Sequence, residues 1–231
     1  MTISNTLPMP GRRCALALLL AVTLVGCATQ PVSRSEPDTL VADAQTTLNN
    51  FLRDPDQTWI QDNLSRAKAV MIAPQIVRAG FIFGGSGGRA VLVARDGRTW
   101  AGPAFYNLAT ASVGFQAGLD VSEAIIVVMT DKGMNSLLSN SFKLGGDASI
   151  AAGPVGASAR STVTADLITF TRAKGIYGGL NLDGTVVSTN IPWNDAYYAR
   201  TNLLPPDILM RRTVTSRNAA GLLADVTKAT K

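Results

Sequence analysis

The chain has 231 residues, of which 46% are hydrophobic and 16% are charged, a composition typical of a protein with a packed core and not of a disordered segment, a collagen or a long coiled coil. Its 21 basic and 16 acidic residues give a net charge of +5, and no dense run of Lys and Arg is interleaved with aromatic residues as in a nucleic-acid-binding site. The sequence contains no histidine, which excludes Ser-His-Asp and Cys-His catalysis and zinc sites built on imidazole.

The N-terminal 26 residues are typical of an export signal. Arg12 and Arg13 precede an apolar run over 14–25, which is about as long as the core of a signal peptide and shorter than the ~20 residues that span a bilayer. A glycine and then Cys27 follow, and this ending resembles the lipobox of bacterial lipoproteins. The resemblance implies that residues 1–26 are removed and that Cys27 is the lipid attachment site, with diacylglycerol on its sulfur and palmitate or a similar acyl chain on its amino group.

The cysteine count supports this interpretation. Cys14 lies within the expected signal peptide, so Cys27 is the one cysteine that the mature chain keeps, and acylation accounts for an exported protein with a single thiol. An unmodified cysteine behind an ordinary signal peptide is the alternative. Ala28, and not aspartate, follows the cysteine, and by resemblance to Gram-negative lipoproteins this favours the periplasmic face of the outer membrane. Since each buried methylene contributes ~0.8 kcal/mol, two or three acyl chains make the attachment essentially permanent.

The mature chain is expected to start with a tether and to continue as one domain. Residues 27–38 are polar and contain two prolines, which predicts a flexible tether before a single domain over 39–231. Apolar residues then recur at helical spacing and predict a helix that ends near Arg53. Directly after it, the run 54–57 places an acid, a proline, an acid and a glutamine where they favour the start of a second helix. The apolar face of that helix comprises Trp59, Ile60, Leu64 and Ala67.

The chain between Gly80 and Gly184 is expected to form strands. It contains 18 of the 21 glycines, mixed with short runs of β-branched and aromatic residues that are typical of strands. Turn signals at 95–98 and 182–185 favour antiparallel hairpins over βαβ crossovers. Repeated glycines inside strands indicate bends or bulges. One short helix, capped by Asp131, is expected to interrupt the strands.

The C-terminal part is expected to be helical again. Pro205, Pro206 and Asp207 favour one helical turn, and Ser216 favours the cap of a last helix. That last helix is expected to bury Ala219, Ala220, Leu223 and Val226. The sequence therefore predicts an α+β fold, in which a glycine-rich, strongly bent antiparallel β-sheet or barrel-like core is flanked by N- and C-terminal helices.

Short motifs give weak support for enzyme chemistry. Residues 85–90 fit the G-x-G-x-x-A pattern of a pyrophosphate-binding loop, but the residues after them alternate like a strand and offer no helix N-terminus to a phosphate. Ser65 and Lys68 match S-x-x-K, but the partner motifs S-D-N and K-T-G are missing. Asp120 and Glu123 are three residues apart, so in a strand they point to opposite faces and do not share a glycosidase-like site. No cofactor and no metal-binding loop is expected.

Longer stretches resemble a known family. The segment 67–118, AKAVMIAPQIVRAGFIFGGSGGRAVLVARDGRTWAGPAFYNLATASVGFQAG, followed by SFKLGGDASIAAGPVG, AKGIYGGLNLDGTVV and NDAYYAR, resembles the SYLF lipid-binding domain, and the match extends over about 40–225. The resemblance implies binding to membranes: eukaryotic members bind phosphoinositide-containing membranes, some bind actin, and exported bacterial members are lipid-binding lipoproteins. The family has no established catalytic residues. Actin and phosphoinositides are not expected in a periplasm, so the resemblance implies only general lipid binding here.

The sequence thus predicts a non-enzymatic, lipid-anchored envelope protein whose domain binds phospholipid or a membrane surface, with membrane lipids as partners, no nucleic acid, and protein partners unknown. The candidates for lipid binding are basic residues around the N-terminal helices and the first strand: Arg53, Arg66, Lys68 and Arg78. Each of them alone is also typical of ordinary surface charge. Two alternatives stay open, a scaffold that binds other envelope proteins and an envelope hydrolase. The hydrolase would use Asp120, Glu123 or Asp147 as acid and base.

Overall fold

The computed structural model describes residues 32–80, 83–113, 118–156, 163–173, 176–177 and 181–231. The chain divides into two units, of which Val32–Lys231 is compact and contains every element described below. The expected signal peptide, Cys27 and the first residues of the expected tether lie outside the described residues.

The N-terminal helix is longer than the sequence predicts. Helix α2 (Ser35–Arg53) begins four residues before the expected domain start at 39, so the end of the expected tether is helical. Glu36 and Asp38 lie in its first turn, where carboxylates interact favourably with the helix dipole, and a proline is tolerated at this point of a helix. The helix ends at Arg53, as predicted, and it buries one side, comprising Pro37, Val41, Ala44, Thr47, Leu48 and Phe51.

The predicted second helix is present as three short pieces, η2 (Pro55–Gln57), α3 (Thr58–Asn63) and η3 (Leu64–Arg66). Its start has the expected cap, because the Asp54 carboxylate accepts a hydrogen bond from the backbone N–H of Asp56 at 2.9 Å. The predicted apolar face is also confirmed, since Trp59, Ile60, Leu64 and Ala67 are all buried.

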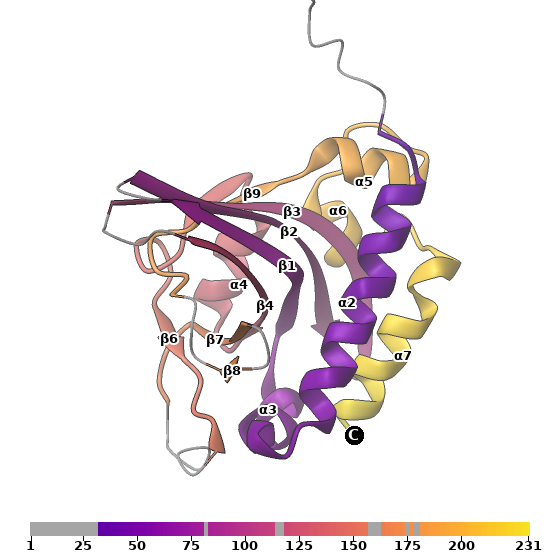
Figure 1. Ribbon diagram of the computed structural model, residues 1–231. Coiled ribbons are helices and arrows are strands. Elements are labelled where there is room, and N and C mark those ends of the chain that lie inside the picture. The colour runs from indigo at the N-terminus through magenta and orange to yellow at the C-terminus, as the bar shows by residue number, and fades with distance from the viewer. Residues whose placement is uncertain (1–31, 81–82, 114–117, 157–162, 174–175, 178–180) are drawn as a thin grey trace, which may run out of the picture. The chain divides into compact units, whose positions relative to one another are not determined.

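Four long antiparallel strands form the centre of a nine-stranded sheet: β1 (Ala69–Gly80), β2 (Phe83–Asp96), β3 (Thr99–Val113) and β4 (Gly118–Val128). Five short strands complete it: β5 (Ser141–Lys143), β6 (Ile150–Ala152), β7 (Leu167–Ala173), β8 (Ile176–Tyr177) and β9 (Val186–Thr189). The strand order is β5-β9-β3-β2-β1-β4-β7-β6, with β8 paired to β7; among the strand pairs of the described residues, β6–β7 is the parallel one. The sheet is strongly curved (Figure 1), so the predicted α+β fold with a bent, mainly antiparallel sheet is confirmed.

The bend in the sheet has a local cause. The register of β1 shifts between Ile72 and Gln75 against β2, and between Ala73 and Ile76 against β4, which is the signature of a β-bulge. Gly88 lies opposite this bulge, where an added Cβ would lie 2.6 Å from the backbone oxygen of Gln75. Only glycine therefore fits at this position of β2.

The described helices of the C-terminal half are α4 (Asp131–Leu138), α5 (Ile191–Tyr198), α6 (Pro205–Leu209) and α7 (Ala220–Ala229), and η5 (Arg217–Ala219) directly precedes α7. The expected cap of α4 is wrong by one residue, because the Thr130 hydroxyl accepts from the N–H of Gly133 and Asp131 is the first helical residue. The predicted cap at Ser216 is present, but it caps η5, because the Ser216 hydroxyl accepts from the backbone N–H of Asn218 and α7 itself has no side-chain cap. On α7, however, Leu222 is buried, whereas Ala220 is exposed and Leu223 is half-buried.

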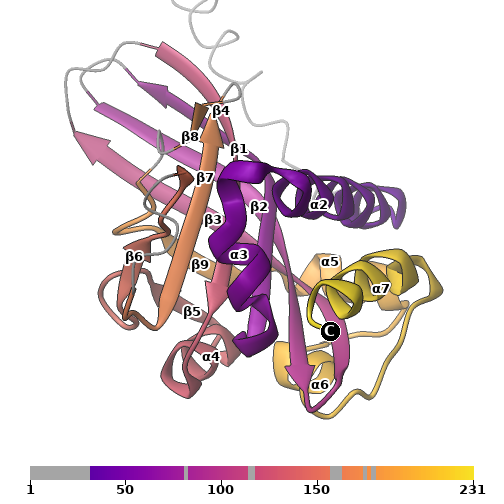
Figure 2. The ribbon, with the colours of Figure 1, turned by 90° about the horizontal axis from the view of Figure 1, so that it is seen from below.

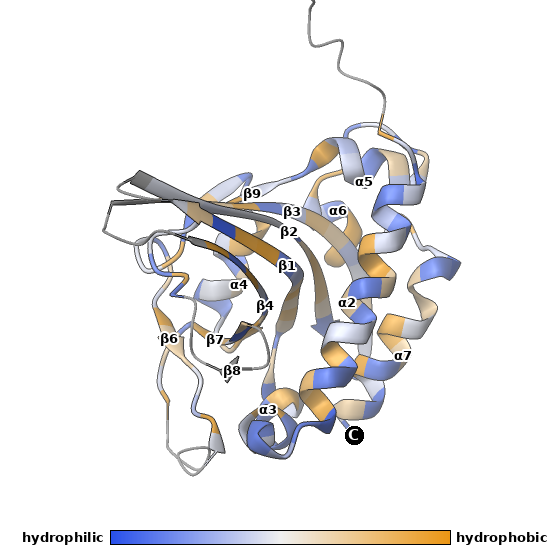
Figure 3. Cartoon of the chain, in the orientation of Figure 1, coloured by the Kyte–Doolittle hydropathy of each residue, from blue (hydrophilic) through white to orange (hydrophobic). Residues whose placement is uncertain are grey.

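Two apolar cores lie on the two faces of the sheet. One packs strand residues against α2, α3, α5 and α7, and we call this side the helix-side face. The other packs the opposite face against α4 and α6. Figures 1 and 2 show α2 and α7 side by side along the sheet, and in Figure 3 apolar residues run along β1 and β2 next to α2. The described residues of both cores belong to the compact unit Val32–Lys231, and a compact unit with its own apolar core is expected to fold as a domain.

Candidate functional site

The four basic residues proposed from the sequence lie in different surroundings. Arg53 is exposed at the end of α2, beside a groove that it shares with Lys228 of α7. Arg66 is exposed in η3 and donates to the side-chain oxygen of Asn63 at 3.3 Å. The Lys68 ammonium lies 2.8 Å from the carboxylate of Asp131.

Arg78 is distant from the other three. It lies in β1 ten residues after Lys68, which corresponds to roughly 30 Å of extended strand. Its side chain is on the side of the sheet opposite to the helix-side face, because it lies two residues after Ile76, which belongs to the core on that other face. The structure therefore does not gather the four cations into one surface, and their role in lipid binding stays a prediction.

The structure instead exposes apolar side chains on the part of the helix-side face that the helices do not cover. Of the six exposed large hydrophobic residues in the described part of the chain, four lie there: Val77, Leu119, Val121 and Val186. Leu119 is the most exposed of them, at 68%. A single exposed apolar residue is ordinary, but a contiguous group marks an interaction site.

Strand register shows that these residues are contiguous. Val121 pairs with Val77, Val77 with Gly87, Gly87 with Ala109, and Ala109 with Val186, so one apolar row crosses five strands. A second row lies two residues further out, and it comprises Leu119, Ala79, Gly85 and Ala111. We call these nine residues the distal face. Because paired residues of antiparallel strands point to the same side, the distal face is a single apolar surface.

The opposite side of the same strand segments is polar. Asp120, Arg78, Ser86 and Thr110 form one register row between the two apolar rows, and the Thr110 hydroxyl lies 2.7 Å from that of Thr185. The outer part of the sheet is therefore amphipathic, with small and aliphatic side chains on one side and hydrogen-bonding groups on the other.

Cations border the distal face. Lys143 is the register partner of Val186 and extends the first apolar row with an exposed ammonium group. Arg89 lies one row inward, paired with Gln75 and Asn107, and its guanidinium carbon lies 4.4 Å from the centre of the Trp193 ring, within the range of a cation–π contact. Between this row and α2 lies a groove of about 440 Å³, which includes Leu40, Val77 and Gly87 in its walls.

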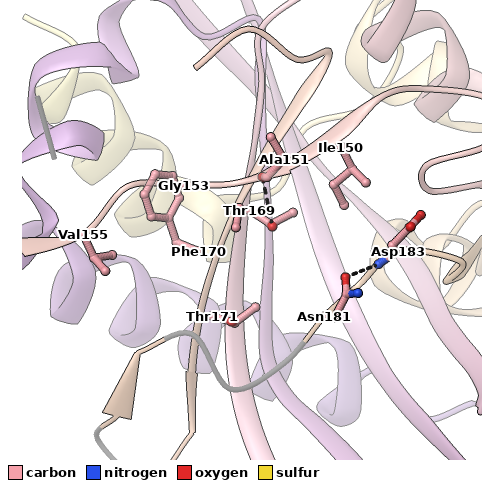
Figure 4. Close-up of a pocket in the computed structure, with 10 residues that line it drawn as sticks. Ile150, Ala151, Gly153, Val155, Thr169, Phe170, Thr171, Asn181 and Asp183 are labelled. Carbon is pink, nitrogen blue, oxygen red and sulfur yellow. Dashed lines mark hydrogen bonds between the residues drawn. The ribbon is translucent and has the colours of Figure 1, made fainter. Parts of the chain in front are cut away.

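A second hollow, of about 300 Å³, lies beside β6 and β7. Figure 4 shows Asn181 and Asp183 on one side of it and Phe170 and Val155 on the other. The Asn181 side-chain oxygen accepts from the backbone N–H of Asp183 at 2.9 Å. Among the described residues that line this hollow, Asp183 is the one with an ionisable side chain, so the hollow does not combine an acid with a base.

The groups with the most perturbed pKa values lie outside both hollows and support the fold. Hydrogen bonds from the Thr130 hydroxyl and from Ser149 hold the pKa of Asp166 well below its usual range, at distances of 2.6–2.9 Å. Burial raises the pKa of Tyr106, whose hydroxyl donates to the Leu137 backbone oxygen at 2.6 Å. These contacts fasten the start and the end of α4.

Comparison with known proteins places the chain in a family. The family model described as Ysc84, Las17-binding protein actin regulator, matches residues 109–230. The chain belongs to the Ysc84 family. The match covers more than half of the chain, and it confirms the predicted SYLF resemblance. It begins in β3 and therefore includes the distal-face residues of β3, β4 and β9, whereas those of β1 and β2 precede it.

Relatives of this Ysc84-family chain are longer proteins. LAS seventeen-binding protein 3 of Saccharomyces cerevisiae is 31% identical over 152 residues, which are 62% of this chain and 33% of the relative. Protein YSC84 of the same yeast is 28% identical over 170 residues, 67% of this chain and 36% of the relative. The human SH3 domain-containing YSC84-like protein 1 is 27% identical over 175 residues, 73% and 50% respectively. The chain thus spans between a third and a half of these relatives.

The carboxylates of the hydrolase alternative do not converge in the Ysc84-family domain. Asp120 and Glu123 lie on opposite faces of β4, as their spacing predicts. Glu123 accepts hydrogen bonds from Thr47 and Arg172, and Asp147 accepts from the backbone N–H of Lys143 at 2.7 Å. Within the described residues, no group of three or more acidic or cysteine side chains is placed to hold a metal ion. No helix in that part of the chain combines the length and apolarity that crossing a membrane requires.

The sequence contained a signal for the distal face that our sequence analysis did not use. Leu119 and Val121 alternate with Asp120 and Ser122, which is the period of a half-buried strand. The pattern alone predicts one apolar side of the strand. Only the length of α2 and its position on the sheet decide that this side is left exposed.

Proposed function

We propose that this Ysc84-family domain is a non-enzymatic membrane-binding module that lays its distal face on phospholipid. The observation that carries the proposal is the apolar surface that register assembles from five strands and that leaves Leu119, Val121, Val77 and Val186 exposed. Transfer of such an aliphatic side chain from water to an apolar environment is favourable by about 1.5–3 kcal/mol. Contact with the acyl boundary of a bilayer therefore supplies the driving force.

Charge at the border of the distal face favours anionic phospholipids. Lys143 ends the first apolar row, and Arg89 lies in the row next to it. A Lys or Arg close to an anionic membrane surface contributes about 1 kcal/mol, and this contribution falls off within a Debye length. The arrangement resembles that of peripheral proteins that combine an inserted apolar surface with basic side chains at the headgroups.

The lipobox-like segment supports the same function. Acylation of Cys27 would hold the domain at a membrane permanently and would raise the effective concentration of the distal face near lipid. We propose the periplasmic face of the outer membrane as the location. Cys27→Ser is expected to abolish incorporation of labelled palmitate and to leave residues 1–26 attached. Labelling and cleavage of this variant at the same position would refute the anchor.

Vesicle binding by the Val32–Lys231 segment tests the distal face without the anchor. Leu119→Asp with Val121→Asp is expected to lower the partition coefficient on phosphatylglycerol-rich vesicles at least about tenfold, because two apolar contacts are replaced by repelled charges. The matched control is Leu204→Asp with Met210→Asp, since these two are the exposed large apolar residues outside the distal face. The control is expected to bind like the wild type, and equal losses in both variants would refute the proposal.

A protein-binding scaffold is the second candidate function. The name of one relative, LAS seventeen-binding protein 3, and the family description, Las17-binding protein actin regulator, favour it. If the wild-type segment binds neither anionic nor neutral vesicles, the distal face is better explained as a protein interface. Sedimentation of the same segment then shows whether two copies associate through it.

A further inference from the structure

The groove between α2 and the sheet changes from polar to apolar along its length. At its inner end lie Gln75, Arg89 and Asn107, which form one register row across β1, β2 and β3. Two residues outward, Val77 and Gly87 belong to the first row of the distal face. Successive rows are about 6.5 Å apart, so a polar end is followed directly by two apolar rows.

Arg89 at the polar end is available to a ligand. Its side chain is exposed, and among the ion pairs of the described residues none joins it to a carboxylate within 4.0 Å. The Trp193 ring holds its guanidinium in place at 4.4 Å from ring centre to carbon. A stacked arginine keeps its in-plane N–H donors free, and these match carboxylate and phosphate oxygens.

The amides beside Arg89 add donors to the same end. The Asn107 side-chain oxygen accepts from Asn190 at 2.9 Å, which leaves its NH₂ group directed elsewhere, and Gln75 is exposed in the row on the other side of Arg89. A head with several acceptor oxygens is therefore matched by a guanidinium flanked by two amides.

A glycine on β2, Gly87, shapes the apolar end of the groove. At Gly87 an added Cβ would have the Leu108 backbone oxygen, 3.8 Å away, as its nearest neighbour, which is ordinary contact. Neither steric conflict nor a positive φ therefore requires glycine at this position. Leu40 of α2 and Val77 of β1 contribute to the walls, so the glycine leaves a shallow apolar channel beside aliphatic side chains, within the volume range of small-molecule sites.

We propose that this groove binds one anionic single-chain amphiphile, with its carboxylate or phosphate head at Arg89 and its alkyl chain along Val77 and Gly87 toward the outer rows. The inference rests on the proposed function, in that the distal face meets lipid, and it extends it from adhesion to the capture of an individual lipid molecule. A fatty acid and a lysophospholipid share the chemistry that the groove requires.

Binding of palmitate and of lysophosphatidylglycerol, each below its micelle concentration, tests the groove in the Val32–Lys231 segment. Calorimetry and native mass spectrometry are expected to show one molecule bound per chain. Arg89→Gln is expected to weaken binding of the anionic amphiphiles at least about tenfold, since a charge-assisted bond is lost. The control Arg98→Gln removes an exposed cation from the turn between β2 and β3, away from the groove, and is expected to change binding less than about twofold. Stronger binding of one of the two probes identifies the head that the groove prefers.

A second variant tests the channel without touching a charge. Gly87→Val is expected to fill the channel and to weaken both probes at least about tenfold, while the melting temperature stays the same or rises, because valine is the better strand residue. The matched control is Gly146→Val, because an added Cβ at Gly146 also meets only ordinary contacts, the nearest at 3.7 Å, and its φ is not positive, unlike that of Gly97, Gly156 and Gly184. It is expected to bind both probes normally.

The outcomes separate this proposal from membrane adhesion. If Arg89→Gln and Gly87→Val both bind palmitate and lysophosphatidylglycerol as the wild type does, the groove proposal is refuted, whatever the vesicle assay shows. If the wild type binds one amphiphile in an Arg89-dependent manner but ignores vesicles, the groove stands and the membrane-binding function falls. Acetate has the carboxylate head without the alkyl chain. If the wild type binds acetate as tightly as palmitate, the assignment of the apolar end is wrong.

Discussion

The two halves of the helix-side face are built from the same four central strands and differ in what they present. In the covered half, residues such as Val91 and Ile125 pack under the helices and are fully buried. In the distal half, Gly87 and Ala109 occupy the same face, and Leu119 is 68% exposed. Large side chains thus fill the space where the protein supplies its own partner. Small ones, edged by a few aliphatic residues, leave room where the partner comes from outside.

The largest expected effect contrasts two residues of one strand. Ile125 and Leu119 lie six positions apart on β4 and point to the same face. Ile125→Ala is expected to lower the free energy of unfolding by about 2–5 kcal/mol, because it opens a cavity in the helix-side core. Leu119→Ala is expected to change it by less than about 0.5 kcal/mol, since its side chain has little to lose. Urea denaturation of both variants measures the difference.

The same pair is expected to reverse its order in vesicle binding. Leu119→Ala weakens the partition coefficient by about threefold or more, from the loss of part of one aliphatic contact, whereas folded Ile125→Ala binds like the wild type. Similar stability losses for both variants would mean that the distal half is also packed in solution and would remove the basis of the comparison.

The next effect concerns the boundary between the two halves. Glu123 lies there, 18% exposed, with Arg172 bound to one oxygen and the Thr47 hydroxyl 3.0 Å from the other, so it fastens β4 and β7 to α2. Glu123→Gln is expected to cost about 1–3 kcal/mol of stability, because the charged partner loses a charge-assisted bond in a mostly desolvated place. Asp120→Asn, on the opposite face of the same strand, serves as the control and is expected to cost less than about 0.5 kcal/mol.

This pair of variants also tests the hydrolase alternative. A catalytic Glu123 would tolerate Gln structurally and lose activity, whereas a fastening Glu123 loses stability. Thermal melts of Glu123→Gln at low and high salt are informative, because a partly buried pair is screened less than an exposed one. If Glu123→Gln has the same melting temperature as the wild type at both salt concentrations, Glu123 is again a candidate catalytic acid.

A smaller effect on stability is expected at low pH from Asp166, which lies on the side of the sheet that packs against α4. The Asp166 pKa lies below its usual range, mainly through hydrogen bonds from Thr130 and Ser149, and its side chain is 12% exposed. A group with a lowered pKa contributes stability that is present above the unfolded-state value of about 3.9 and is lost as the pH falls toward the folded-state value. Asp166→Asn is therefore expected to be less stable than the wild type at pH 7 by about 1 kcal/mol and to lose less of its stability below about pH 4. Parallel acid-denaturation profiles of the two proteins would contradict this assignment.

How far the sequence reaches can be seen in single residues. Asp54 predicts its helix start because capping is local, and the spacing of Asp120 and Glu123 predicts opposite faces because strands alternate. Helix α5 was missed although Asn190 and a proline mark its start, because its buried Asn194 is positioned by a distant contact, accepting from the backbone N–H of Phe105 at 2.9 Å. Non-local pairing of this kind leaves no periodic pattern.

The candidate site was harder to predict than the fold for the same reason. Arg89 is one basic residue in a glycine-rich strand, and nothing in its neighbourhood in the sequence distinguishes it from an ordinary surface charge. Its role depends on Trp193, which is far along the chain and stacks on it only because β3, β9 and α5 are arranged as they are. The sequence instead predicted lipid binding by the basic residues near the N-terminal helices, because these residues are close to one another in the sequence.

The smallest expected effect decides which end of the sheet meets the membrane. Arg53, Arg66 and Lys68 lie at the covered end, and Arg78 alone lies in the outer part of β1. If the distal face is the contact, Arg78→Gln is expected to weaken binding to anionic vesicles less than about twofold, because its side chain lies on the opposite side of the sheet from the lipid and even a cation at the surface contributes only about 1 kcal/mol. Joint neutralisation of the other three is then expected to leave binding within about twofold, because exposed charges more than a Debye length of ~8 Å from the lipid are screened. Both variants should melt like the wild type, since the ion pair of Lys68 with Asp131 is exposed and contributes about 0–1 kcal/mol. A larger loss from the triple variant than from Arg78→Gln would place the membrane at the helices instead and would make the distal face a surface for another protein.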